Sequence, residues 1–209
     1  MLKVWGRANS SNVAKVTWCI GELGLESERI DWGGRFGGND DPDYRDLNPT
    51  GRVPTIEEDG EFSLWESGAI VRYLCAKHSP GGLCPNDLRV RAEAEKWMDW
   101  SAISLHPFNP AFVANMFVLP PEKRDAEAIV TAVKNAAPLF GILDHHLSSR
   151  AFICGDQFTM ADIPAGTLTH RWIAYAPERP QHPNLESWYE RLKQRPAYVE
   201  HVCSITPGR

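Results

Sequence analysis

The pattern of segments changes once along this chain, and that change limits the possible fold more than any other feature. Over the first eighty residues, short strand-like and helix-like segments alternate, whereas every periodic segment after residue 87 is helical. Such alternation is typical of a sheet covered by helices, and Asp59-Gly60 is a strong hairpin signal between the last two strands. The expected order is β-α-β-α-β-β-α, with strands at residues 2–5, 28–32, 53–58 and 62–65 and helices at about 12–24, 42–47 and 68–78.

Residues 79–87 (Ser-Pro-Gly-Gly-Leu-Cys-Pro-Asn-Asp) are dense in turn formers and mark the point where the strand pattern stops. We therefore predict an α/β domain of residues 1–80, a linker of residues 81–87 and an all-helical domain of residues 88–209. Within the second domain, apolar spacing predicts a loop over 109–121 and helices over 88–105, 121–148 with a kink at Pro138, from about Thr159 onward, and over 183–195.

Charge and cysteine content exclude several classes of function. The net charge is -5 and no run of Lys or Arg occurs, so we expect no nucleic-acid partner. No stretch approaches the roughly 20 apolar residues of a membrane span, and the chain begins with a strand pattern rather than a signal sequence, so we expect a cytoplasmic protein with no membrane partner. The five scattered cysteines form no CxxC or Cys/His cluster and predict neither a disulfide framework nor a metal site.

The turn before the first helix, Asn9-Ser10-Ser11-Asn12, is the first candidate site. Unpaired N-H groups at a helix start favour an anion such as a thiolate, and a serine hydroxyl can donate a hydrogen bond to the sulfur. The simple alternative is that these residues only cap the helix. A redox role would need a cysteine at this turn, but the nearest, Cys19, lies within the helix and is expected in the core.

Two further segments are candidate ligand contacts. In Asn48-Pro-Thr-Gly-Arg-Val53-Pro54, a proline at a strand start allows a cis bond and leaves the backbone of Val53 open to pair with an extended peptide. Glu66-Ser67 places a carboxylate and a hydroxyl beside the N-H groups of the next helix. Taken singly, these segments are better explained as a strand-entry proline and a helix cap.

The ordered combination of these three segments resembles the soluble glutathione transferase family over nearly the whole chain. The residues that carry the resemblance are Asn-Ser-Ser-Asn-Val-Ala-Lys-Val, Asn-Pro-x-Gly-x-Val-Pro and Trp-Glu-Ser-x-Ala-Ile-x-x-Tyr-Leu, with Phe158 to Asp162 matching the family's helix-start motif. The serine-type classes, theta and its bacterial relatives, are most similar, because Trp5-Gly6-Arg7 stands where tyrosine-type classes carry tyrosine. The resemblance implies a thioredoxin-like domain followed by a helical domain.

The same resemblance implies roles for individual residues. Ser10 would activate the glutathione thiol, with Ser11 as the alternative, and glutathione would be the co-substrate with no other cofactor and no metal. The implied glutathione contacts are the backbone of Val53 with a cis Pro54, Glu66 and Ser67 at the γ-glutamyl end, and Asn39, Arg52 and Asn12 near the glycyl end or supporting the turn.

The second substrate is expected between Ser10 and the helix that follows the linker. An aromatic wall suits a small hydrophobic electrophile, although bulky aromatic residues at helical spacing also make ordinary interdomain core. The candidate residues are Trp97, Trp100, Ser101, Leu105, Phe108 and Phe112.

The sequence therefore predicts a glutathione transferase, implied to be a homodimer acting in detoxification, that adds the thiolate to an electrophilic carbon. Two alternatives stay open: a non-catalytic glutathione-binding or assembly module, and a glutathione-dependent isomerase or dehalogenase with the same glutathione site.

Overall fold

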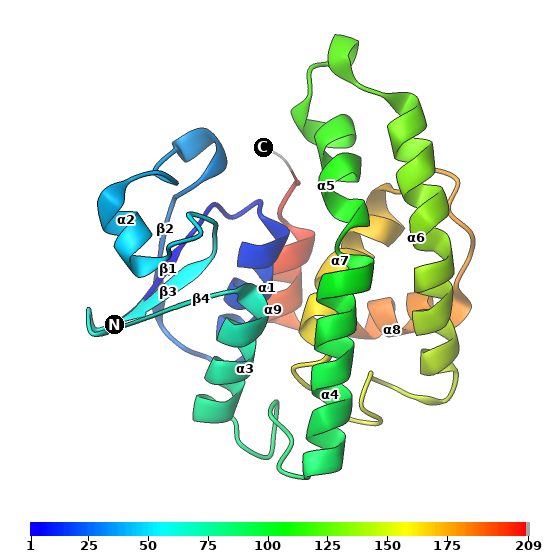
Figure 1. Ribbon diagram of the computed structural model, residues 1–209. Coiled ribbons are helices and arrows are strands. Elements are labelled where there is room, and N and C mark those ends of the chain that lie inside the picture. Colours follow the sequence, from blue (N-terminus) through cyan, green and yellow to red (C-terminus); the bar gives the residue numbers. More distant parts are fainter. Residues whose placement is uncertain (208–209) are drawn as a thin grey trace.

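The N-terminal domain is a four-stranded mixed sheet with helices on both faces (Figure 1). The computed structural model describes residues 1–207. Strand order is β2-β1-β3-β4, with β1 parallel to β2 and antiparallel to β3, and β3 antiparallel to β4. The elements are β1 (Leu2–Trp5), α1 (Ser11–Glu22), β2 (Ser27–Ile30), a 3-10 turn (Gly34–Phe36), α2 (Pro42–Leu47), β3 (Thr55–Glu58), β4 (Phe62–Trp65) and α3 (Ser67–His78).

Local signals in the sequence account for this domain. The β3–β4 connection of residues 59–61 has positive φ at Asp59 (53°) and Gly60 (78°), as tight hairpin turns often require, and the two strands pair antiparallel, so the predicted hairpin is confirmed. Helices α1 and α3 pack together on one face of the sheet. On the other face, Tyr44 of α2 packs between Trp5 and Trp32, with ring centroids 6.0 and 5.3 Å away.

The C-terminal domain is entirely helical within the described residues 88–207, and α7 lies at its centre (Figure 1). Among α7 residues 162–172 all are buried, packed against α1, α4 and α8. The helices are α4 (Leu88–Trp100), α5 (Phe108–Val113), α6 (Ala126–His146), α7 (Asp162–Tyr175), α8 (Pro183–Leu192) and α9 (Pro196–Tyr198), with π turns at Ser101–Leu105, Ala114–Val118 and Val199–Cys203 and 3-10 turns at Pro121–Lys123 and Leu147–Ser149.

Three boundaries in this domain differ from the sequence prediction. The expected loop over 109–121 is helical to Val118, because Pro110 falls in the first turn of α5, where no backbone N-H is needed. Helix α6 begins at Ala126 rather than 121, since the Asp125 side chain caps it by accepting a hydrogen bond from Ala128 N (3.1 Å). It then runs through Pro138 without interruption, and α8 ends at Leu192.

The start of α7 is fixed by a buried carboxylate. Asp162 accepts hydrogen bonds from the backbone N-H groups of Ile153 and Thr159 (both 2.9 Å) and from the indole of Trp188 (3.0 Å). Burial raises the pKa of Asp162 to about 6, although these donors oppose the shift. Thus α7, which carries Arg171 toward the N-terminal domain, has an anchored first turn.

Residues Ala126–Ser149 are long and apolar enough, by length and composition alone, to cross a membrane. The expectation that no stretch approaches this limit is therefore wrong. In the fold this helix packs against α5 and α8, with Phe140 and Leu143 fully buried, as a core helix of a globular domain does.

Candidate functional site

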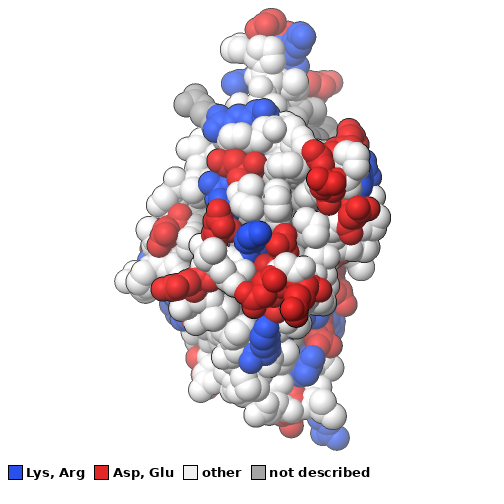
Figure 2. Space-filling model, turned by 90° about the vertical axis from the view of Figure 1, so that its left-hand side faces the viewer, with Lys and Arg blue, Asp and Glu red and all other residues white. Residues whose placement is uncertain are grey.

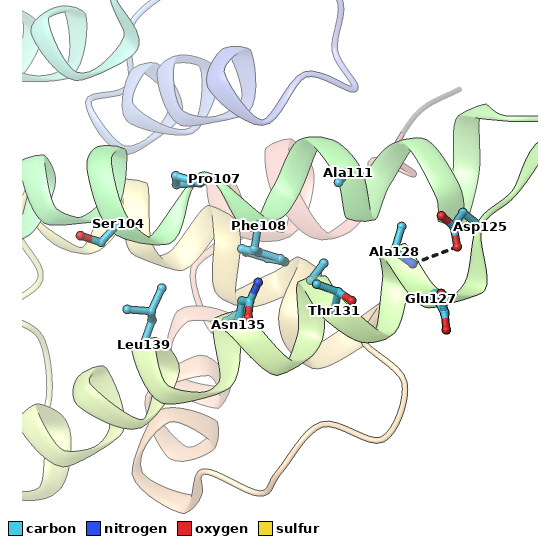
Figure 3. A pocket seen from close by; sticks show the side chains of 12 residues that line it. Ser104, Pro107, Phe108, Ala111, Asp125, Glu127, Ala128, Thr131, Asn135 and Leu139 are labelled. Atoms are coloured by element: carbon cyan, nitrogen blue, oxygen red, sulfur yellow. Dashed lines mark hydrogen bonds between the residues drawn. The ribbon is translucent and has the colours of Figure 1, made fainter.

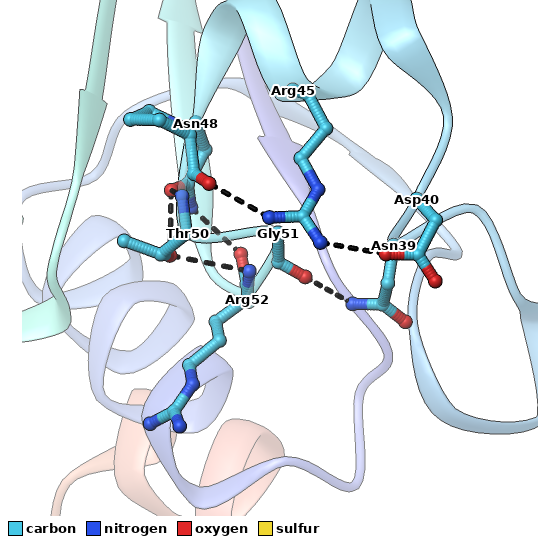
Figure 4. Close-up of polar contacts among 8 residues, drawn as sticks. Asn39, Asp40, Arg45, Asn48, Thr50, Gly51 and Arg52 are labelled. Atoms are coloured by element: carbon cyan, nitrogen blue, oxygen red, sulfur yellow. Dashed lines mark hydrogen bonds and ion pairs between the residues drawn. The ribbon is translucent and has the colours of Figure 1, made fainter.

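The loop before β3 is held by the buried side chain of Asn48 (Figure 4), and the buried Tyr44 hydroxyl also hydrogen-bonds to Arg52 O (2.6 Å) and Thr55 Oγ1 (2.9 Å). Asn48, 1% exposed, donates through Nδ2 to Arg52 O (2.8 Å) and Thr55 Oγ1 (3.0 Å). Its Oδ1 accepts from Thr50 N (3.0 Å) and Thr50 Oγ1 (2.7 Å). The following Val53-Pro54 bond is cis, as the resemblance implies. This network fixes the backbone on which Val53 is presented.

A second layer braces the same loop from outside. Arg45 donates to Pro49 O (2.7 Å) and to Asp40 Oδ1 (2.6 Å), and Asn39 Nδ2 donates to Gly51 O. The Arg52 side chain points away from this network, as Figure 4 shows. Asn39, predicted near the glycyl end of glutathione, thus has its amide N-H engaged in supporting the turn.

A small cavity of about 70 Å³ gathers most of the predicted glutathione contacts. Ser67 lies at its edge, with its hydroxyl 3.5 Å from Asn12 Oδ1, and Glu66 is exposed with a positive φ of 69°. The sequence analysis did not single out Asn48 or Thr50, although both stand within the Asn-Pro-x-Gly-x-Val-Pro motif. The lining residues are Asn12, Asn48, Thr50, Arg52, Val53, Pro54, Glu66 and Ser67.

The two candidate serines at the start of α1 have different surroundings. Ser10 is the residue before the helix, and its hydroxyl makes no capping bond and no other hydrogen bond within residues 1–207. Ser11 is 5% exposed, and its Oγ accepts a hydrogen bond from Asn109 Nδ2 (3.2 Å). Both line one cavity, but Ser11 is the more buried of the two and its Oγ already accepts a hydrogen bond, whereas the Ser10 hydroxyl has no partner within residues 1–207.

The link from Ser11 continues into the helical domain. Asn109 Oδ1 accepts from Arg171 Nη1 (2.7 Å), and Arg171 Nη2 donates to Asn9 O (3.1 Å). Residues from α5 and α7 therefore clamp the turn that carries Ser10. Sequence spacing could not reveal this network, because Arg171 lies 162 residues from Asn9 along the chain.

The cavity beside Ser10 has a volume of about 450 Å³. Its walls are the first turn of α1, the glycine-rich loop at residues 33–38 and the helical stretch from His106 to Val118. None of the six residues predicted for the electrophile site lines it. The lining residues are Arg7, Asn9, Ser10, Ser11, Asn12, Gly34, Arg35, His106, Asn109, Pro110, Val113, Ala114, Val118 and Arg171.

The six predicted electrophile residues lie mainly in the domain core. Trp97, Ser101, Leu105, Phe108 and Phe112 are all at most 7% exposed, and Trp100 is half-buried against Trp97, with ring centroids 5.1 Å apart. Phe108 lines a separate cavity of about 500 Å³ between α5 and α6, which has Asp125 and Glu127 at one end (Figure 3). The role of the six predicted residues as electrophile contacts stays a prediction.

Positive charge is concentrated around Ser10. Lys15 is 3% exposed, and burial, with the nearby charge of Arg171, lowers its pKa to about 8 while Glu66 opposes the shift. Burial lowers the pKa of Arg171 to about 10. His106 has a pKa lowered to about 4, by burial first and then by Lys15 and Arg171, so its ring is neutral at pH 7.

The N-terminal domain is thioredoxin-like, and the start of its first helix faces a cavity shared with an all-helical domain. This arrangement defines the class of two-domain transferases. Models of the glutathione S-transferase N-terminal and C-terminal domains match residues 1–76 and 111–196. Glutathione S-transferase GstB of Escherichia coli (strain K12) is 39% identical over 206 residues, covering 98% of this chain and 99% of that protein. The chain belongs to the glutathione S-transferase family.

Two further relatives show which members of the family the chain resembles. Glutathione S-transferase 3 of Zea mays is 30% identical over 212 residues, covering 98% of this chain and 94% of that protein. The theta class glutathione S-transferase from Xanthomonas axonopodis pv. citri, solved with glutathione bound, is 40% identical with a TM-score of 0.93, covering 100% of this chain and 99% of that one. This similarity agrees with the serine-type resemblance of the sequence.

Proposed function

We propose that the chain binds glutathione with its γ-glutamyl end in the small cavity at Val53 and Ser67 and its thiol beside Ser10, whose hydroxyl activates the thiol. The observation that carries the proposal is the difference between the two serines: Ser10 is half-buried, lines the larger cavity and has no hydroxyl partner within residues 1–207, whereas Ser11 is 5% exposed and its Oγ already accepts a hydrogen bond from Asn109. The structural relative solved with glutathione bound supports the choice of ligand.

The chemistry required of Ser10 is stabilisation of an anion. A thiol with a pKa of about 8.5 is only a few per cent ionised at pH 7, and lowering that pKa by two units needs roughly 2.7 kcal/mol. A hydrogen bond from Ser10 and the N-H groups at the start of α1 both act in this direction. Positioning the thiolate beside an electrophile in the adjoining cavity then supplies the rest of the catalysis.

The reaction we propose is substitution or conjugate addition by the glutathione thiolate, with glutathione as co-substrate and no metal or redox cofactor. We further propose that the protein is a cytoplasmic homodimer and acts in detoxification, as members of serine-type classes are expected to do.

The test compares the native protein with Ser10→Ala and Ser11→Ala, measuring conjugation of glutathione to 1-chloro-2,4-dinitrobenzene and glutathione binding by calorimetry. We expect Ser10→Ala to lower kcat about 100-fold or more with binding retained, because a donor to developing charge is lost. Ser11→Ala should retain most of the activity. Binding without turnover of any electrophile would favour a binding module instead, and no glutathione binding would overturn the proposal.

A further inference from the structure

We propose that the cavity beside Ser10 takes an electrophile that carries a carboxylate, and that Arg7 and Arg35 recognise this charge. The inference rests on the proposed function, since it assigns the substrate class of the cavity into which the Ser10 thiolate would point. It also replaces the expectation of a purely apolar electrophile drawn from the sequence.

The lining of this cavity has one sign of charge. Arg7, Arg35 and Arg171 line it, and no Asp or Glu is among its lining residues. The whole chain carries a net charge of -5, and the face in Figure 2 shows acidic and basic groups interspersed without a continuous basic field. The local excess of positive charge is therefore a property of the cavity and not of the surface in general.

The three arginines differ in the contacts that they already make within the protein. Arg171 is 7% exposed and is bound to Asn109 and Asn9, so it contributes charge but has a structural role. Arg7 is half-buried, and burial lowers its pKa, yet its guanidinium makes no hydrogen bond or ion pair within residues 1–207. Arg35 is exposed and contacts only the ring of Phe36, 4.8 Å from its centroid.

Six of the twelve arginines other than Arg7 and Arg35 within residues 1–207 meet a carboxylate. Those paired in this way are Arg29 with Asp31, Arg45 with Asp40, Arg72 with Asp99, Arg91 with Glu95, Arg179 with Glu186 and Arg195 with Glu22. Burying a guanidinium partly without such a partner costs free energy unless a bound anion pairs with it. Arg7 is therefore positioned to receive an anion from outside the chain, and the exposed Arg35 lines the same cavity, as well as a second one beside it.

The backbone of the glycine-rich loop leaves room for this arrangement. A Cβ at Gly34 would lie 3.0 Å from both Cδ and Nε of Arg7, so only glycine lets the loop approach this side chain. The loop thereby brings Arg35 and Arg7 to the same cavity. A planar guanidinium pair suits a carboxylate, which accepts bidentate hydrogen bonds from arginine.

The carboxylates of glutathione are assigned elsewhere. The glutathione site proposed above lies in the cavity at Val53, Glu66 and Ser67, which shares only Asn12 and no arginine with the cavity beside Ser10. A volume of about 450 Å³ lies within the range of small-ligand sites and accommodates a substituted benzoate. The anion that Arg7 and Arg35 recognise would then belong to the second substrate.

The test uses a matched pair of aryl halides, 4-chloro-3,5-dinitrobenzoate and 4-chloro-3,5-dinitrobenzamide. In both, the thiolate sulfur forms a bond to the ring carbon at position 4, chloride leaves with the carbon–chlorine electron pair, and the thiol proton passes to solvent. Because the uncharged amide activates the ring more strongly, each kcat/KM is divided by the rate constant of the uncatalysed reaction. This division gives a rate enhancement for each compound. We call the rate enhancement for the benzoate divided by that for the benzamide the charge preference.

We expect a charge preference of about 10 or more for the native protein, falling as salt concentration rises because screening weakens the attraction. Arg7→Gln and Arg35→Gln should each lower it several-fold with the KM for glutathione little changed. Arg89→Gln, an exposed arginine on α4 remote from the cavity, is the control and should leave it unchanged.

A native charge preference near 1, with both compounds turned over, would overturn this inference and leave the proposed function standing. So would a rise in the KM for glutathione in Arg7→Gln and Arg35→Gln at an unchanged charge preference, since the arginines would then serve glutathione. Absence of both turnover and glutathione binding would instead overturn the proposed function, and the inference with it.

Discussion

The two cavities that meet at the start of α1 are built in opposite ways. The smaller one, at Val53, draws its lining from residues 12–67, and neutral hydrogen bonds from Asn48 to residues two to seven positions away hold it in shape. The larger one, beside Ser10, draws on residues from Arg7 to Arg171 and contains three guanidinium groups. A site made by short segments of one domain can be predicted from motifs, whereas a site made between domains depends on how distant helices pack.

The difference extends to what supports each cavity. The smaller cavity is supported from within its own loop by Asn48. The larger cavity depends on α7, because Arg171 reaches Asn109 and Asn9 from that helix, and α7 in turn is seated by the buried carboxylate of Asp162. Damage to one support should therefore impair one cavity more than the other.

The largest effect is expected from Asp162→Ala. The change leaves the N-H groups of Ile153 and Thr159 and the indole of Trp188 without their acceptor, and each unsatisfied buried donor costs about 1–3 kcal/mol. We expect the free energy of unfolding, measured in urea, to fall by about 3 kcal/mol or more. In the protein that remains folded, the KM for the electrophile should rise more than that for glutathione.

Asp125→Ala is the matched control, because Asp125 also precedes a helix but is exposed and accepts only from Ala128 N. Its loss should cost about 1 kcal/mol, as for an ordinary cap. Equal losses for the two variants would show that the buried network around Asp162 adds nothing beyond capping.

A smaller effect, of about 2 kcal/mol, is expected from Asn48→Ala. Four hydrogen bonds to Arg52, Thr50 and Thr55 disappear, but the exposed loop groups can partly turn to water. We expect the Kd for glutathione, measured by calorimetry, to rise about 10-fold or more while the KM for the electrophile changes little. Asn86→Ala, at an exposed position before α4 that lines neither cavity, should change neither constant. Parallel weakening of both substrates in Asn48→Ala would contradict the separation of the two cavities.

The same contrast explains how far the sequence could predict the fold. Asp59-Gly60 specifies its hairpin through two positive φ angles, and the helix at Pro42–Leu47 has its own start signal, so the helix was predicted at its observed bounds and the hairpin within two residues. The helix at Phe108–Val113 was missed because its two prolines, Pro107 and Pro110, are typical of a loop. What makes it helical is burial of Phe112 among helices that follow later in the chain.

Prediction of the candidate site divided along the same line. Within the smaller cavity, Val53, Pro54, Glu66 and Ser67 lie together as the motifs suggested, since these residues are close in sequence to the strand and helix that carry them. For the larger cavity, helical spacing marked Trp97 as an apolar residue but could not say whether it faces the cavity or the core. Nothing near Arg171 in the sequence predicts that its guanidinium reaches Asn9.

Substitution of Lys15 probes the place where the two cavities meet, and we expect it to change the free energy of unfolding least. Its Nζ donates to Asn12 Oδ1 (2.9 Å), which lines both cavities, while its buried charge is opposed by that of Arg171. The folded-state pKa, about 8, lies below the roughly 10.4 of an unfolded lysine, so the folded protein binds fewer protons between these values. Charge burial at Lys15 therefore costs stability most fully below pH 8, and this cost is relieved as pH rises toward 10.4.

Lys15→Met keeps the side-chain volume and removes the charge. We expect the free energy of unfolding at pH 7 to rise by about 1–2 kcal/mol, with most of the gain lost by pH 10.5, where the native lysine is neutral when folded and about half ionised when unfolded. Lys134→Met, on the exposed surface of α6, should show no such pH-dependent gain. A loss of stability of the same size at both pH values would mean that the hydrogen bond to Asn12 outweighs the cost of charge burial. A gain at pH 7 together with a lower charge preference would mean that the Lys15 cation, although it lowers stability, helps to bind the anionic substrate.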